Sequence, residues 1–228
     1  MQLMNKGYIK NDDERSSAAV PDDREEKITM LQGAAQTYIF WVDGFDTSSS
    51  TMTHCLYELA LHREIQDKLA EEINDILEEF GSLSYQSVKA IPYLHNVVSE
   101  TLRKYPVTPI LNRECIEEIE LPGTGHRITK GTPLIIPVFG LHSDPEIYPE
   151  PEKFNPEKFS EENIAQKYQY AYLPFGEGPW NCTKVGLVSL LSKYRFTLGP
   201  DVKVPLMMVK TNFVQVPANG VTLRIQMR

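Results

Sequence analysis

The sequence predicts a mainly helical domain of the α+β class. Segments with the apolar periodicity of helices fill the first half of the chain, and short strand-like segments separated by glycine and proline fill most of the second half. This order differs from the alternation of strands and helices that builds a parallel sheet. With 228 residues, of which 41% are hydrophobic, the chain can bury a sizeable core in one or two domains.

The first predicted element is one long helix. Residues 1–26 are polar and without periodicity, so we expect a loop before it. From about Lys27 to His62 the chain is apolar on nearly all sides at first, which is typical of a helix buried in a large core. The centre of this helix, Gly44 to Ser50, contains residues that weaken helices.

Two amphipathic helices follow. Apolar residues three or four positions apart predict a helix over 65–80, which Gly81 would end. The same spacing predicts a second helix over 92–105, with Pro92 in its first turn.

The second half predicts short strands, turns and one more helix. Glycine and proline separate the expected strands, and Asn219-Gly220 is a favourable pair for a tight turn. The expected elements are strands over 113–128 and 132–142, a helix start at Asp144-Pro145-Glu146, irregular packed coil over 148–175, a short buried helix over 185–196, and a hairpin that pairs 213–216 with 221–226.

The composition excludes several classes of protein. The net charge of −8 disfavours a nucleic-acid binder, because lysine and arginine carry the binding of phosphate. No run of about 18 apolar residues and no signal peptide occur, so we expect no membrane anchor in this sequence. The three cysteines, Cys55, Cys115 and Cys182, are widely spaced and odd in number. They favour neither a disulfide framework nor a zinc site, and a reducing compartment is the simplest interpretation.

Glu100 and Arg103 are the first candidate pair. They lie three positions apart on one predicted helix and therefore share a face. An exposed pair of this kind contributes little to stability. The alternative is a partly buried, bidentate pair, because the helix packs hard on the side of Leu102.

Asp46 and Thr47 place an acid beside a hydroxyl at the weak centre of the long helix. Such a pair can hold water and relay protons, and a serine or threonine can bond back to the carbonyl four residues earlier. The alternative is a polar patch that only caps or bends the helix.

The segment from Tyr172 to Cys182 places glycines, prolines and aromatic residues directly before a cysteine. Glycines let a backbone approach a flat cofactor closely, and a thiolate is an axial ligand of haem iron that favours O–O cleavage. An isolated cysteine is more often a small buried apolar residue. Here the surrounding loop favours the ligand role.

Together these segments resemble the cytochrome P450 family of haem-thiolate monooxygenases. Glu100–Arg103 resembles the E-x-x-R motif of that family, and G-F-D-T at Gly44–Thr47 resembles its oxygen-activation motif. F-N-P-E-K-F at Phe154–Phe159 and P-F-G-E-G-P-W-N-C at Pro174–Cys182 resemble its meander and its haem-binding loop. The order and intervals match the family from about residue 27 to the end, and the intervening segments are similar to insect microsomal members.

The resemblance implies the C-terminal part of the cytochrome P450 fold over residues 27–228, a long central helix with further helices and small β-sheets. It implies haem (iron protoporphyrin IX), with the Cys182 thiolate as the axial ligand of the iron. It also assigns cofactor binding to Arg113, which would pair with a propionate, and to Phe175, Gly176 and Gly178 of the loop.

The resemblance also implies a reaction. Asp46 and Thr47 correspond to the acid–alcohol pair that delivers protons to bound oxygen, whereas Glu100 and Arg103 correspond to a structural pair that locks the meander to its helix. The implied reaction inserts one oxygen atom from O2 into a small apolar molecule. The implied partner is NADPH-cytochrome reductase, and the implied location is the cytosolic face of the endoplasmic reticulum membrane.

The sequence departs from the family pattern in several places. Asp43 replaces a small residue, Lys158 replaces the meander arginine, and Trp180 replaces the arginine two residues before the cysteine. After Cys182 the sequence lacks roughly two helical turns that the family pattern has. It also lacks the family's N-terminal half with the membrane anchor. We therefore expect a truncated monooxygenase. The alternative is a non-catalytic remnant or partial gene product that keeps the fold signature without turnover.

Overall fold

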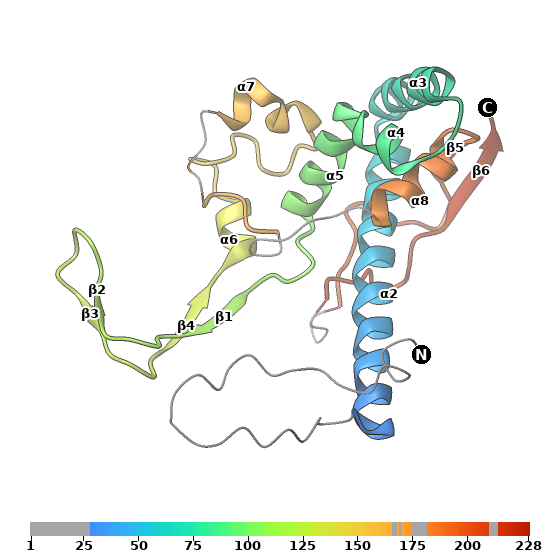
Figure 1. Cartoon of the computed structure of the whole chain (residues 1–228). Coiled ribbons are helices and arrows are strands. Elements are labelled where there is room, and N and C mark those ends of the chain that lie inside the picture. Colours follow the sequence, from blue (N-terminus) through green and yellow to red (C-terminus); the bar gives the residue numbers. More distant parts are fainter. Residues whose placement is uncertain (1–27, 166–167, 169, 175–181, 210–213) are drawn as a thin grey trace. The chain divides into compact units, whose positions relative to one another are not determined.

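The computed structural model describes residues 28–165, 168, 170–174, 182–209 and 214–228, with the backbone alone for Val42, Asp43 and Cys182 (Figure 1). The chain forms two compact units, residues 1–46 and residues 47–228. Helices dominate the described residues, and small antiparallel sheets accompany them, so the predicted mainly helical α+β class is confirmed.

The long helix predicted from the apolar segment is present as α2, Met30–Leu61. It runs without a break through the weak centre, and two threonines directly after that centre bond back to it. Thr51 Oγ1 donates to the Thr47 carbonyl at 2.9 Å, and Thr53 Oγ1 donates to the Ser49 carbonyl at 2.8 Å. These bonds satisfy the two hydroxyls within the helix, so neither needs a partner outside it.

Both amphipathic helices are confirmed, as α3, Arg63–Phe80, and α5, Pro92–Lys104. The left-handed backbone of Gly81, with φ of 70°, ends α3 where the glycine predicted it. The short helix α4, Tyr85–Lys89, lies between them and was not predicted. Ser84 and Ser87 cap its first turn reciprocally.

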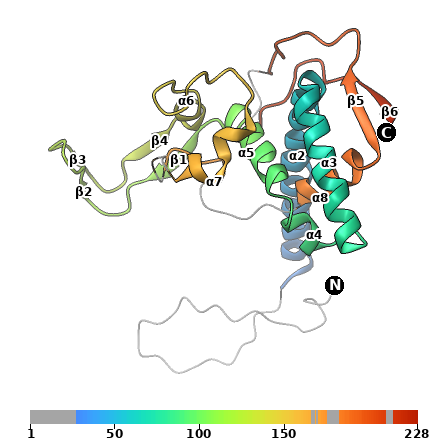
Figure 2. The same cartoon turned by 90° about the horizontal axis from the view of Figure 1, so that it is seen from above.

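The core of residues 47–228 lies where these helices meet α8, Cys182–Leu191 (Figure 2). Gly186 of α8 lies so close to Met52 of α2 that a Cβ atom at this position would sit 2.7 Å from the Met52 sulfur. The apolar side chains of the core come mainly from α2, α3, α5 and α8; fully buried examples are Leu59, Leu69, Ile73, Leu94, Val97, Leu187 and Leu191.

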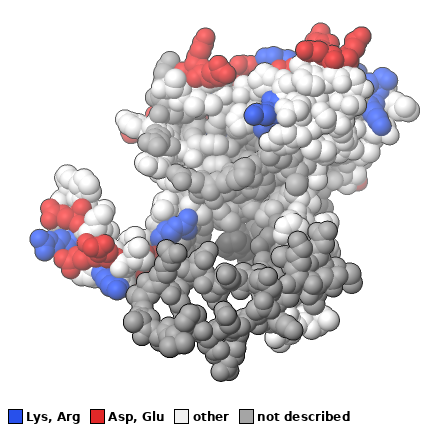
Figure 3. Space-filling view, viewed as in Figure 1, with Lys and Arg blue, Asp and Glu red and all other residues white. Residues whose placement is uncertain are grey.

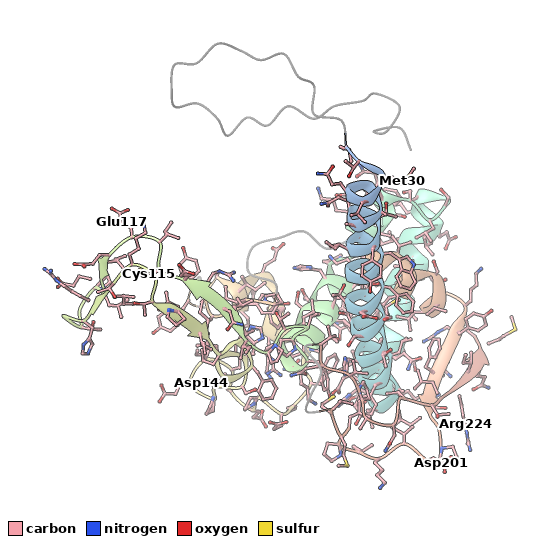
Figure 4. All side chains as sticks on the ribbon, turned by 90° about the horizontal axis from the view of Figure 1, so that it is seen from below. Met30, Cys115, Glu117, Asp144, Asp201 and Arg224 are labelled. Carbon is pink, nitrogen blue, oxygen red and sulfur yellow. The ribbon has the colours of Figure 1, made fainter. Side chains whose placement is uncertain are left out.

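The described strands form three two-stranded antiparallel sheets. In the first, β1, Leu111–Glu114, pairs with β4, Pro133–Ile136. In the second, β2, Ile119–Glu120, pairs with β3, Arg127–Ile128, and the hairpin carries charges of both signs (Figure 3). Cys115 and Glu117 lie at the base of this hairpin, where the Cys115 thiol donates to the Glu117 carbonyl at 2.8 Å (Figure 4).

Three predictions in this region were wrong. The strand expected over 132–142 ends at Ile136, and Val138–His142 forms the short helix α6. Asp144 does cap the backbone that follows, since its Oδ1 accepts from the Glu146 N–H at 2.9 Å, but only a turn forms there. Beyond it, the predicted irregular coil contains two short helices, η1 (Pro156–Phe159) and α7 (Glu161–Ile164).

The hairpin predicted near the end of the chain was also wrong. The strand β6, Leu223–Met227, pairs with β5, Tyr194–Leu198, and residues 214–216 form no strand. The helix predicted over 185–196 ends earlier, at Leu191, because residues 194–198 form β5 instead. Gly220 does adopt a positive φ of 66°, so the turn is present without the predicted pairing. Among the described residues, no helix combines the length and the apolar character that crossing a membrane requires.

Candidate functional site

Glu100 and Arg103 form a buried, bidentate ion pair on α5. Arg103 Nε donates to Glu100 Oε2 at 2.6 Å, and Arg103 Nη2 donates to Glu100 Oε1 at 3.0 Å. The side chains are 0% and 1% exposed. Of the two interpretations of this motif, an exposed pair and a buried bidentate pair, the structure shows the buried one.

The same pair fixes the segment that follows α6. Arg103 donates to the carbonyls of His142 and Pro151 at 2.8 and 2.7 Å, and Glu100 Oε1 accepts from the Asn155 N–H at 3.0 Å. All five donors of a guanidinium lie in one rigid plane, so these contacts set the path of the backbone around α5. The pair is therefore structural, in agreement with the role expected for it.

Lys158 completes this cluster with a single ammonium group. Its Nζ lies 3.4 Å from Glu100 Oε1 and donates to the carbonyls of Glu150 and Lys153 at 3.0 and 2.8 Å. Burial lowers the pKa of Lys158, and the Glu100 carboxylate partly offsets this effect. A lysine thus fills the position expected for an arginine, with point contacts in place of a fork.

His142 and Tyr172 anchor the chain just before the predicted haem-binding loop. The Leu173 N–H donates to His142 Nε2 at 3.0 Å, and the Tyr172 hydroxyl donates to the Ser99 carbonyl at 3.0 Å. The two rings stack with their centroids 5.4 Å apart. Burial, together with the nearby Arg103 charge, lowers the pKa of His142 to about 4, and so the ring is neutral. The sequence reasoning missed this histidine, since nothing about a single His between a leucine and a serine distinguishes it.

A polar network follows Thr47 along the next turns of α2. Ser50 Oγ donates to the Gln215 carbonyl at 2.7 Å and lies 3.5 Å from His54 Nδ1. Because the Ser50 hydroxyl already donates its proton to the Gln215 carbonyl, it can only accept from His54. Nδ1 therefore carries the proton of this imidazole, and Nε2 holds a lone pair. His54 Nε2 has no hydrogen-bond partner in the described part of the chain, and burial lowers the pKa of His54 to about 4. The His54 ring stacks on Tyr105 of the segment after α5, with centroids 4.5 Å apart.

The predicted catalytic and ligand residues fall on different elements. Asp46 and Thr47 lie on α2, at the boundary between the two units, and Asp46 is exposed. Cys182 is the first residue of α8. Free backbone N–H groups in the first turn of a helix stabilise a thiolate, so this position suits a cysteine that binds metal as an anion.

Arg113 lies on β1, where its side chain is exposed. Its one hydrogen bond to the described residues runs from Nη1 to the Asn112 carbonyl at 2.9 Å. The guanidinium therefore keeps donors for an external carboxylate, which fits the propionate contact expected of it. Phe175, Gly176, Gly178 and Trp180 lie outside the described residues, as does the side chain of Asp43.

The cytochrome P450 family model matches residues 13–224 of the chain. Two similar proteins of Drosophila melanogaster, probable cytochrome P450 6a14 and probable cytochrome P450 6a13, are each 43% identical to it. These alignments cover 90% and 89% of the chain and 42% and 43% of the relatives. Cytochrome P450 6k1 of Blattella germanica is 39% identical and covers 98% of the chain and 45% of that protein. The chain thus spans less than half the length of these relatives.

The alignment with the Blattella protein also reveals an internal difference. It extends over 237 residues, although the whole chain has 228. The relative therefore carries residues within the matched region that have no counterpart here.

Proposed function

The chain belongs to the cytochrome P450 family, and on that premise we propose that it is part of a haem-dependent monooxygenase acting on a small apolar molecule. The observation that carries the proposal is the family match over nearly the whole chain, together with a cysteine at the first residue of α8. Residues 27–228 would form the partial cytochrome P450 domain.

The residues present fit a haem group by their chemistry. Cys182, at a helix start, would ligate the iron as a thiolate, and the exposed guanidinium of Arg113 would bind a propionate. Phe175, Gly176 and Gly178 would shape the loop against the ring, because glycine allows a close approach of the backbone. Haem held by a thiolate supplies the activation of O2 that oxygen insertion requires.

Asp46 and Thr47 would deliver protons on the oxygen side. A carboxylate and a hydroxyl at adjacent positions can pass a proton through water. The Thr47 carbonyl already accepts a hydrogen bond from the Thr51 hydroxyl. Electrons would come from an NADPH-cytochrome reductase, and the location would be the cytosolic face of the endoplasmic reticulum membrane. Both assignments rest on the family alone.

A second candidate function is a non-catalytic family member. The internal residues that the chain lacks relative to the Blattella protein favour it. If they are the helical turns expected after Cys182, the thiolate would keep its helix start but lose part of its cover.

Reconstitution with haemin distinguishes the two. The full chain is loaded with haemin, reduced with dithionite and exposed to carbon monoxide. A thiolate-type Soret band of the ferrous–CO complex, lost in Cys182→Ser and kept in Cys115→Ser, supports the monooxygenase site. An imidazole-type band, or a band unchanged by Cys182→Ser, contradicts thiolate ligation and favours the non-catalytic candidate.

A further inference from the structure

A cavity of about 450 Å³ lies at the C-terminal end of α2. Its walls come from the end of α2, the end of α5, α6, the segment around Phe154 and the segment 204–208. None of the residues predicted to bind haem or to move protons lines it. Its volume is within the range of small-molecule sites, which is about 300–1,000 Å³.

One wall of the cavity is polar and held rigidly. The Glu58 carboxylate is fully buried behind it, and its Oε1 accepts from the Tyr105 hydroxyl at 2.5 Å and from Lys104 Nζ at 2.9 Å. Glu58 Oε2 has no hydrogen-bond partner among the described residues. Lys104 lines the cavity and is 19% exposed, so its remaining N–H groups are available to a ligand.

His62 supplies a free acceptor to the same cavity. Its Nδ1 lies 2.9 Å from the Glu58 carbonyl, and since a carbonyl only accepts, Nδ1 carries the proton. Nδ1 also lies 3.5 Å from Glu58 Oε2, so both contacts hold a proton on Nδ1. This tautomer leaves Nε2 as the hydrogen-bond acceptor of the imidazole, and no described residue donates to it. The ring stacks on Phe154 with centroids 5.6 Å apart, which fixes its orientation.

Much of the remaining lining is apolar and partly open. Leu61 is 38% exposed, Phe139 46% and Val204 59%. A ligand with an apolar body would cover this surface, and the burial would favour binding.

The charges of the lining select a neutral ligand. Lys104 lies 2.9 Å from the Glu58 carboxylate and Lys153 lies 3.6 Å from the Glu150 carboxylate, so both lysines of the lining already have an anionic partner. An anionic ligand would therefore find no unpaired cation and would be costly to desolvate, and the two ammonium groups would repel a cationic ligand.

We propose that this cavity binds a small neutral apolar molecule that carries a hydroxyl group. The hydroxyl donates to His62 Nε2 and accepts from Lys104 Nζ, while the apolar body covers Leu61, Phe139 and Val204. The proposal does not rest on haem binding or on monooxygenase activity.

The probe is 2-naphthol, with naphthalene as the matched compound that lacks the hydroxyl. Titration of the full chain by calorimetry, without haemin, should give saturable 1:1 binding of 2-naphthol and at least about tenfold weaker binding of naphthalene, which loses two hydrogen bonds, one of them to an ammonium group. Equal binding of the two compounds, or no saturable binding of 2-naphthol, overturns the proposal.

Two pairs of variants test the location. His62→Phe keeps a ring against Phe154 but removes the acceptor, so it should weaken 2-naphthol binding about fivefold and leave naphthalene binding unchanged; exposed His126→Phe is the control. Phe139→Ala should weaken the binding of both compounds, whereas Phe80→Ala, at a residue 43% exposed, should not. If His62→Phe and Phe139→Ala bind 2-naphthol like the unaltered chain, the probe binds elsewhere and the proposal is wrong.

Discussion

At the scale of single residues, Arg103 has the most demanding position in the described chain. It is 1% exposed and donates to Glu100 and to two carbonyls. We expect Arg103→Lys to lower the free energy of unfolding by about 3 kcal/mol, because an ammonium cannot span these acceptors and would leave buried groups unpaired. Urea denaturation measures the loss.

Arg127→Lys is the matched control for that substitution. Arg127 is 70% exposed and lies 3.5–3.6 Å from Glu118 and Glu120. Its replacement should change stability by less than about 0.5 kcal/mol. Equal losses in the two variants would show that the buried fork is not what stabilises the fold.

Two buried histidines predict a loss of stability in mild acid. The pKa values of His54 and His142 fall from 6.5 to about 4 on folding, so the unfolded chain takes up protons first as the pH decreases. Their contribution is complete above pH 6.5 and is lost between pH 6.5 and 4. At pH 5 each histidine should cost about 2 kcal/mol relative to pH 7.

Urea denaturation at pH 7 and pH 5 tests this dependence. His54→Phe keeps a ring against Tyr105 and removes one titrating group, so the difference between the two pH values should shrink by about 2 kcal/mol. The exposed His126→Gln should leave the difference as it is. A His54→Phe variant with the full pH dependence would contradict the assignment.

At the scale of elements, Gln66 joins α3 to β5. Its side-chain amide donates to the carbonyls of Leu59 and Phe196 at 2.8 and 3.0 Å and accepts from the Phe196 N–H at 2.8 Å. Gln66→Ala should lower the free energy of unfolding by about 2–4 kcal/mol, because buried backbone groups at the sheet edge lose their partners. Exposed Gln86→Ala, compared by thermal unfolding, should change stability little. A small loss in Gln66→Ala would mean that water replaces the amide.

The same scale shows what the sequence could predict. The helices over 63–80 and 92–104 follow from local periodicity, a glycine stop and a proline start, and all three act within a few residues. The pairing of β5 with β6 depends on a partner far along the chain, and no local pattern identifies it. Residues 138–142 fold as a helix although their apolar run is equally typical of a strand.

In the candidate site, too, local spacing predicted some contacts, whereas contacts with distant segments could not be predicted. The motif Glu100–Arg103 predicted a contact that the fold contains, because both residues lie on one turn of one helix. The roles of His54 and His142 depend on burial and on backbone atoms of distant segments, which spacing alone does not reveal. The functions of Asp46, Thr47, Arg113 and Cys182 stay predictions.

At the scale of the whole molecule, the first unit presents apolar side chains of α2 to solvent. Phe40 is 84% and Trp41 66% exposed. Apolar surface of this kind favours association, so replacing both residues by Glu should lower the average mass measured by light scattering. The double variant Ile116→Glu and Ile119→Glu, in the β2–β3 hairpin, is the control and should leave the mass unchanged. If both double variants behave alike, association does not involve α2.

The antiparallel pairing of β5 with β6 determines when the fold can close during synthesis. β5 leaves the ribosome well before β6, and Asp67 of α3, which binds both Arg195 and Arg228, leaves earlier still. The sheet edge therefore lacks its partner strand, and this carboxylate one of its arginine partners, until residues 223–228 have emerged. A nascent chain that stalls before residue 223 would hold formed helices beside an unpaired strand edge, which favours pairing with another chain.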